Sequence, residues 1–137
     1  MGTALMFIDT SVIVALLADE ADAAAYSERI EHSTAKLTSG LVILEASMRL
    51  GTMLDIDPVA VERRIRDLLV AANIDVVPID GVIATEAVAA FAKYGKGRGH
   101  PAQLNLADCM SYACAKVHDV PLMFKGNDFS HTDIARA

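Results

Sequence analysis

The chain has 137 residues and a net charge of −6, with 53% hydrophobic and 22% charged residues. This length fits one domain over residues 1–137, and so large an apolar fraction excludes a disordered chain. The acidic total argues against a protein that holds nucleic acid by overall positive charge, but it leaves room for a local basic surface.

Cysteine spacing and hydropathy exclude further classes of protein. Cys109 and Cys114 lie five residues apart in one predicted helix, which is a poor geometry for a disulfide, and no Cys/His spacing resembles a zinc site. No apolar run approaches the roughly 18 residues of a membrane-spanning helix. Because Asp9 interrupts the first apolar run, that run does not resemble a signal peptide. We therefore expect a cytoplasmic protein without a membrane partner.

Short apolar runs alternate with helical patterns along the chain. Residues 4–8 form an apolar run, as expected of a buried strand, and Asp9 can cap a helix that continues to Leu17. Asp22 is a candidate cap for the second helix. The remaining predicted elements are helices over 22–32, 40–54, 57–72, 80–94 and from Asn105 onward, and strands over 36–38, 74–77 and 121–124. This alternation indicates an α/β domain with a mostly parallel sheet.

Four acidic residues, Asp9, Glu45, Asp108 and Asp128, stand near predicted strand ends and helix starts. Each has an ordinary structural explanation. Asp9 can cap a helix, and Glu45 can pair with Arg49 four residues later. Asp108 falls in the first turn of a helix, where the helix dipole favours a carboxylate, and Asp128 can be a turn residue.

The joint placement of these acids is more informative than each acid alone. In a parallel sheet, functional sites form beyond the carboxyl ends of the strands. Clustered carboxylates repel one another, and a divalent cation relieves that repulsion. Ligands that are all oxygen favour Mg²⁺ or Mn²⁺ over zinc, and such a centre can activate water against a phosphodiester.

A glycine-rich segment precedes the helix of the third acid. Residues 95–100 alternate glycine with Lys96, Arg98 and His100, a spacing that fits neither a Walker loop nor a dinucleotide fingerprint. The segment is either a solvated connection or an RNA-binding rim, in which Lys125 beside the fourth acid would also contact phosphates.

Four short motifs around the acids resemble, in order and spacing, those of a known family. The motifs are Phe7-Ile8-Asp9-Thr10-Ser11-Val12, Glu45 with Arg49, Leu104-Asn105-Leu106-Ala107-Asp108-Cys109, and Phe124-Lys125-Gly126-Asn127-Asp128-Phe129. Together they are similar to the PIN-domain ribonucleases, in particular the VapC-type toxins of bacterial toxin–antitoxin pairs. Two positions differ: Ala107 stands where relatives often have Gly, and Phe124-Lys125 where many have Thr or Ser.

The resemblance implies a three-layer α/β/α PIN-like nuclease domain, an Mg²⁺- or Mn²⁺-dependent endoribonuclease, a VapB-like antitoxin partner and a homodimer. It implies that Asp9 and Asp108 bind metal directly, and that Glu45 and Asp128 act through water or a second metal. Hydrogen bonds to metal-bound water or phosphate would then come from Thr10, Ser11 and Asn127.

Two other functions remain open from the residues. The first is an inactive PIN-like module that only binds a partner, which the presence of all four acids argues against. The second is a phosphotransfer domain that forms an aspartyl phosphate on Asp9, but Ser11 stands where that chemistry usually has a second Asp. A dimer or antitoxin surface would use apolar helix residues, with candidates at Met48, Leu50 and Met53 that otherwise belong to the core.

Overall fold

The computed structural model describes residues 5–137, so residue 4 of the expected first strand lies outside the described residues. Four strands form one sheet in the order β3-β2-β1-β4, and every neighbouring pair is parallel. The strands are β1 (Leu5–Ile8), β2 (Ala35–Ser39), β3 (Ile74–Val77) and β4 (Leu122–Met123). The expected mostly parallel sheet is confirmed.

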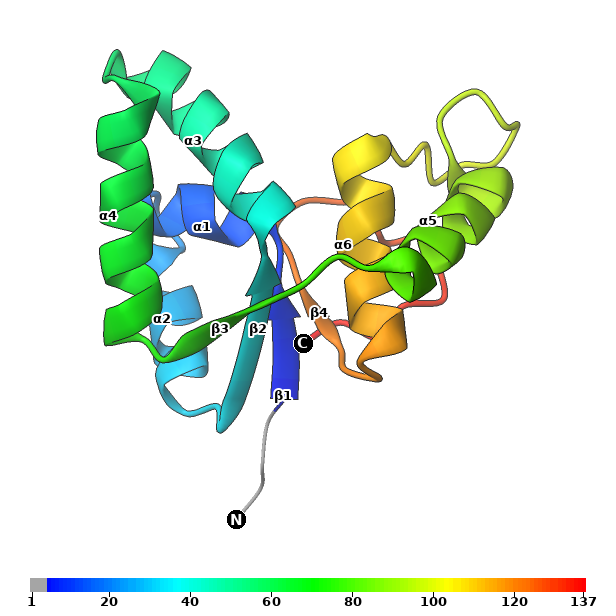
Figure 1. The fold of residues 1–137 in the computed structure, drawn as a ribbon, viewed down its shortest axis with the longest axis horizontal. Helices are drawn as coiled ribbons and strands as arrows, with labels where there is room; N and C mark the ends of the chain where they lie inside the picture. The colour runs from blue at the N-terminus through cyan, green and yellow to red at the C-terminus, as the bar shows by residue number, and fades with distance from the viewer. Residues whose placement is uncertain (1–4) are drawn as a thin grey trace.

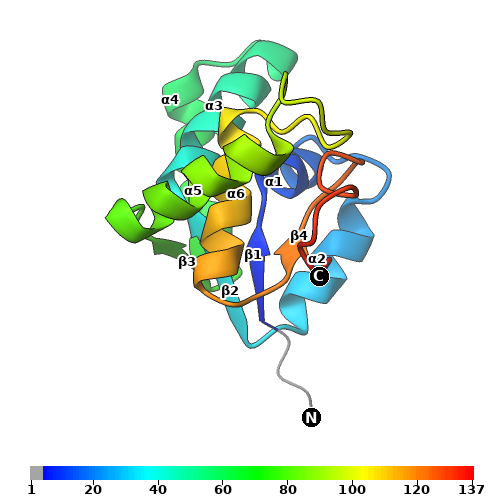
Figure 2. The same cartoon turned by 90° about the vertical axis from the view of Figure 1, so that its right-hand side faces the viewer.

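Six helices among these residues cover the sheet on both faces. They are α1 (Thr10–Leu17), α2 (Ala23–Glu31), α3 (Gly40–Leu54), α4 (Pro58–Ala71), α5 (Gly81–Tyr94) and α6 (Leu106–Val117). Figures 1 and 2 show α5 and α6 on one face and α1 to α4 on the other, which confirms the three-layer α/β/α fold. Over residues 5–137, no helix has the length and apolar character needed to cross a membrane.

Side-chain caps fix where most of the helices begin. At the start of five of these helices the side chain of the N-cap residue accepts a hydrogen bond from a backbone N–H. The N-cap residues are Asp9, Ser39, Asp57, Asp80 and Asn105. Such a cap stabilises a helix by about 1 kcal/mol.

Asp22 departs from the prediction that it caps α2. It occupies the N-cap position, but its side chain makes no capping hydrogen bond. The carboxylate instead accepts a hydrogen bond from Lys125 at 3.2 Å.

The central strand β1 is buried on both faces, with Phe7 and Ile8 inaccessible to solvent. This explains why it reads as a continuous apolar run rather than an alternating one. The strand at the edge, β4, is shorter than predicted, and its outer side pairs with the C-terminal tail: Leu122 N–H donates to Ala135 O at 2.8 Å, and Ala137 N–H to Leu122 O at 2.9 Å. The carboxyl end of β1 therefore lies inside the sheet, flanked by β2 and β4.

Candidate active site

Asp9 follows the last residue of β1 and is also the N-cap of α1. Its Oδ2 accepts hydrogen bonds from the Ser11 backbone N–H at 3.2 Å and from Ser11 Oγ at 2.7 Å. The residue is only 6% exposed. The central strand therefore delivers one oriented, nearly buried carboxylate to the carboxyl edge of the sheet, where sites form in open α/β sheets.

Asp108 lies in the first turn of α6 and forms a capping box with Asn105. Asn105 Oδ1 accepts from the Asp108 N–H at 2.8 Å, and Asp108 Oδ2 accepts from the Asn105 N–H at 3.1 Å. Figure 1 shows that the amino end of α6 lies at the same end of the molecule as the carboxyl end of β1. The helix start thus holds a second carboxylate near the first.

The four acids share one electrostatic environment at Asp108. Burial is the main reason that the pKa of the Asp108 carboxyl rises from 3.8 to about 7. The charges of Asp128, Asp9 and Glu45 contribute to this rise, and the hydrogen bond with Asn105 opposes it. The four acids come from four separate segments of the chain, and the fold places the other three close enough to Asp108 for their charges to affect its pKa.

Glu45 and Asp128 are more open to solvent than the other two acids. Glu45 is half-buried on α3 and lines a shallow groove of about 280 Å³ between α3 and the amino end of α6, beside Leu106 and Ala107. Among residues 5–137 the salt bridges do not include Glu45 with Arg49, the pair that was the structural alternative for Glu45. Asp128 is exposed in the turn after β4. In the part of the chain that the structure describes, neither carboxylate forms a salt bridge.

The three supporting residues differ in their surroundings. Ser11 contacts Asp9 and also accepts a hydrogen bond from the Lys125 N–H at 2.9 Å. Thr10 is buried in the first turn of α1, and Asn127 is exposed beside Asp128. Of the three, Ser11 is the one that joins two parts of the site.

The acids suit a hard divalent cation by chemistry, although they are not arranged as a finished metal centre. Within the described range 5–137, no three or more His, Cys, Asp or Glu side chains are grouped so that they could hold a metal ion. Asp9 and Asp108 each use Oδ2 for hydrogen bonds, and no residue in that range donates to their Oδ1 atoms. An all-oxygen donor set with these unused oxygens fits Mg²⁺ or Mn²⁺ rather than zinc.

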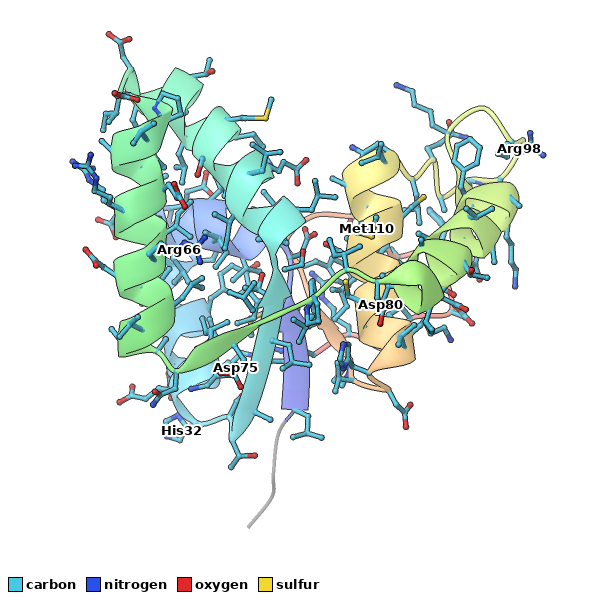
Figure 3. All side chains as sticks on the ribbon, viewed as in Figure 1. His32, Arg66, Asp75, Asp80, Arg98 and Met110 are labelled. Carbon is cyan, nitrogen blue, oxygen red and sulfur yellow. The ribbon has the colours of Figure 1, made fainter. Side chains whose placement is uncertain are left out.

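The basic residues predicted to bind RNA fall into two groups. Lys96 and Arg98 are exposed on the segment between α5 and α6, and Figure 3 shows Arg98 directed outward. His100 is half-buried: its Nδ1 accepts from the Ala102 N–H at 3.1 Å, and its ring packs edge-on against Tyr94. The ammonium group of Lys125 is bound to carboxylates at 2.9 Å and 3.2 Å. Lys96 and Arg98 are therefore the cations of this set that face solvent.

Sequence reasoning missed the partners of Lys125, which are Glu20 and Asp22 in the turn between α1 and α2. No local signal joins them to Lys125, because more than a hundred residues separate them. The reciprocal bond from Asn105 to Asp108 had a signal, since an acid three residues after an N-cap is the capping-box pattern. Leu50, a candidate surface residue, is fully buried, whereas Met48 is 59% and Met53 is 51% exposed.

Comparison with known proteins places this chain in a family. The model of the PIN domain matches residues 6–135. Ribonuclease VapC28 of Mycobacterium tuberculosis is 42% identical over 132 residues, covering 96% of this chain and 97% of the relative. Ribonuclease VapC30 of the same species is 44% identical over 133 residues, with 95% and 96% covered. The chain belongs to the PIN-domain family and, within it, to the VapC type.

Solved structures share the fold at lower sequence identity. VapC20 of Mycobacterium tuberculosis, described as a Sarcin-Ricin loop cleaving toxin, superimposes with a TM-score of 0.75 at 16% identity, covering 95% of this chain and 96% of that one. A chain of a toxin–antitoxin complex from Klebsiella pneumoniae gives a TM-score of 0.69 at 21% identity, with 95% and 93% covered. At these identities the similarity establishes the fold alone.

Proposed function

We propose that this protein is a metal-dependent endoribonuclease that acts as the toxin of a VapBC-type pair in the cytoplasm. The observation that carries the proposal is the placement of the acids: Asp9 directly after the inner strand β1 and Asp108 in the first turn of α6, with the charges of Asp128 and Glu45 also felt at Asp108. The names of the curated relatives, VapC ribonucleases, support the same activity.

The residues of the site have separate roles in this reaction. Asp9 and Asp108 hold Mg²⁺ or Mn²⁺ directly, and Glu45 and Asp128 act through water or a second cation. The chemistry that a divalent cation supplies there is stabilisation of negative charge on the phosphodiester and activation of water. Ser11 orients Asp9 through its 2.7 Å hydrogen bond.

Basic residues on the segment between α5 and α6, rather than the acids of the site, contact the RNA. Lys96 and Arg98 are exposed and bind phosphates of the RNA, which brings an anionic substrate to an acidic site. His100 and Lys125 have protein partners in this structure and contribute less to RNA contact.

Two protein partners follow from the same assignment. An antitoxin of the VapB kind neutralises the nuclease, and two copies of the chain form a homodimer. Exposed apolar side chains beside the site offer such contacts: Leu44 is 56%, Met48 is 59% and Leu106 is 72% exposed. Analytical ultracentrifugation of the antitoxin-free protein decides between a dimer and a monomer.

An RNA cleavage assay tests the proposed activity. The purified protein, free of antitoxin, is incubated with total bacterial RNA in Mg²⁺, Mn²⁺ or EDTA. We expect discrete products with metal and none in EDTA, and at least a 100-fold loss in Asp108→Asn because a direct ligand is replaced. Sequencing the product ends identifies the RNA and the cleaved bond.

One alternative function, partner binding without catalysis, is distinguished when a binding measurement is added to the cleavage assay. If the folded parent protein cuts no RNA, but a variant lacking all four carboxylates still binds its partner normally, the chain is a partner-binding module. Membership in the PIN family gives the aspartyl-phosphate alternative no support.

A further inference from the structure

The loop that carries Asp128 is attached to Asp9 through a single hydroxyl group. We call residues 124–129 the Asp128 loop. Its Lys125 N–H donates to Ser11 Oγ at 2.9 Å, and Ser11 Oγ donates to Asp9 Oδ2 at 2.7 Å. Two consecutive hydrogen bonds therefore connect the first acid, Asp9, to the backbone of this loop at Lys125, three residues before the fourth acid.

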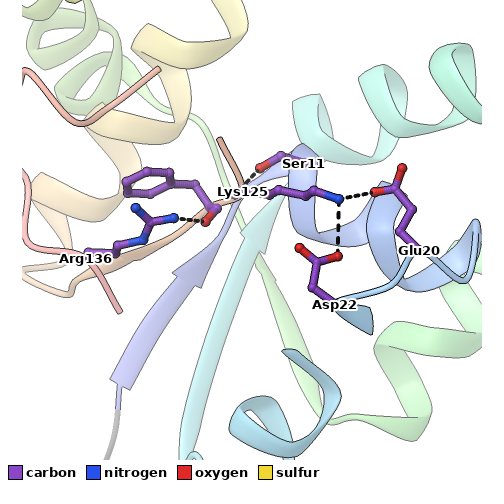
Figure 4. A network of polar contacts seen from close by, with 6 residues as sticks. Ser11, Glu20, Asp22, Lys125 and Arg136 are labelled. Atoms are coloured by element: carbon purple, nitrogen blue, oxygen red, sulfur yellow. Dashed lines mark hydrogen bonds and ion pairs between the residues drawn. The ribbon is translucent and has the colours of Figure 1, made fainter. Parts of the chain in front are cut away.

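The side chain of Lys125 attaches the same loop to a different part of the fold. Its Nζ donates to Glu20 Oε1 at 2.9 Å and to Asp22 Oδ1 at 3.2 Å, both in the turn between α1 and α2 (Figure 4). These bonds raise the pKa of the Lys125 ammonium, so the group stays charged at neutral pH. One positive charge between two carboxylates leaves this spot negative, which disfavours a phosphate there.

Aromatic packing closes the loop. Phe124 and Phe129 are buried, and their ring centroids are 5.0 Å apart. Arg136 stacks over the Phe124 ring at 4.1 Å and donates to the Phe124 carbonyl at 3.1 Å. Between these rings Gly126 has φ +96, a conformation that favours glycine. Asp128 itself is exposed, and within residues 5–137 its side chain accepts no hydrogen bond, so its position depends on how the loop is held.

We propose that Lys125 is a positioning residue, whose bridge to Glu20 and Asp22 holds the Asp128 loop so that the fourth carboxylate faces Asp9 and Asp108. The inference rests on the proposed nuclease function. It assigns Lys125 a role in orienting the site instead of the RNA contact that its sequence position suggested.

Two variants separate the two roles of Lys125. Lys125→Met removes both the bridge and the positive charge. The double variant Glu20→Gln/Asp22→Asn removes the bridge but leaves the ammonium free to contact RNA. Lys125→Arg keeps the charge and the donors. The control is Lys116→Met. Lys116 lies on α6 outside the site, and its Nζ is paired with Asp133 at 2.9 Å.

The experiment measures kcat and KM for RNA cleavage together with hydrogen exchange of the backbone amides of residues 124–130. We expect Lys125→Met and Glu20→Gln/Asp22→Asn to exchange faster in this segment and to lose about 10- to 100-fold in kcat, with KM within about twofold of the parent. Lys125→Arg and Lys116→Met should match the parent in both measurements.

The results also distinguish this inference from the proposed function. If the double variant keeps the parental kcat while Lys125→Met raises KM alone, Lys125 contacts RNA and the positioning role is wrong. Unchanged exchange in both bridge variants overturns it as well, and this readout needs no nuclease activity. A parent protein that cuts no RNA would refute the function while the exchange data still decide whether the bridge holds the loop.

Discussion

Asp108 has two roles that make opposite demands on one carboxyl group. As part of the capping box it starts α6 and accepts a hydrogen bond from the Asn105 N–H. As a member of the acidic cluster it is 9% exposed, and burial and three neighbouring carboxylates raise its pKa to about 7. The metal-free protein therefore carries an unfavourable charge whenever Asp108 is ionised, and a bound cation would remove this penalty.

Replacing Asp108 with Asn should stabilise the metal-free protein more at pH 8 than at pH 5. The pKa of Asp108 is raised by folding, so the folded protein holds this proton more tightly than the unfolded chain between pH 4 and 7. Stability from this group is complete at low pH and is lost as pH rises through about 7. The gain at pH 8 is a few kcal/mol at most, because one pKa unit corresponds to about 1.4 kcal/mol.

Urea denaturation in EDTA at the two pH values measures this effect. Added Mg²⁺ should stabilise the parent at pH 8 and leave the variant unchanged, since a ligand stabilises only the state that binds it. An equal change in the variant's stability at both pH values would show that Asp108 is not protonated near neutrality.

At this scale, the local positions of Asp9 and Asp108 were predictable and the long-range ion pairs of Lys125 were not. Asp9 and Asp108 stand directly beside predicted element ends, which a local pattern reveals. The hydrogen bonds from Lys125 to Glu20 and Asp22 join segments far apart in the sequence. The Asp22 carboxylate binds Lys125 and does not make the predicted capping hydrogen bond to α2. A single sequence holds no record of such long-range pairing.

Helices and strands were predictable wherever the signal was local. Helix starts coincide with capping residues such as Ser39, Asp57 and Asp80, and each helix carries an apolar stripe of helical period. The pairing of the C-terminal tail with β4 was not predicted, because residues 134–137 have no strand pattern and their bonds to Leu122 form only after the chain folds.

The glycines at the two ends of α5 differ in how much space surrounds them, and alanine substitutions test this difference. Gly95 closes the helix, and a Cβ there would overlap the ring and the carbonyl oxygen of Phe91. Gly95→Ala should therefore destabilise the protein by about 1–3 kcal/mol, as overpacking does. At the other end, a Cβ on Gly81 meets nothing within 4 Å, so Gly81→Ala should be neutral or stabilising by up to about 1 kcal/mol.

Thermal denaturation of both variants provides the comparison. A lower melting temperature is expected only for Gly95→Ala, together with faster hydrogen exchange in the segment that leads into α6. If the two alanine variants melt alike, the contact between Gly95 and Phe91 does not constrain the end of the helix.

Over the whole molecule, an acidic protein must attract an anionic substrate. The net charge is −6, and the acids that form the site add to the repulsion. Lys96 and Arg98 are exposed on the segment that leads into α6, so two positive charges lie close in the chain to the start of the Asp108 helix. The net charge alone does not reveal this placement, but the order of residues does, because residues 95–104 directly precede α6.

The salt dependence of RNA binding tests this distribution. In EDTA, which prevents cleavage, the dissociation constant for a single-stranded oligonucleotide is measured by fluorescence anisotropy over a range of salt concentrations. The double variant Lys96→Gln/Arg98→Gln should bind more weakly. The slope of log affinity against log salt should be smaller by about 1.4, because each phosphate contact to a single strand contributes about 0.7.

The control for that experiment is Arg63→Gln/Arg64→Gln, which removes the same charge from an exposed face of α4. This control should keep the parental slope, since α4 lies on the other face of the sheet from α5 and α6 (Figure 1). Equal slopes in the two double variants would mean that RNA responds to total charge rather than to the rim, and Lys96 and Arg98 would then have no specific role. A reduced slope only in the rim variant would locate the path of the RNA along the segment that ends at Asp108.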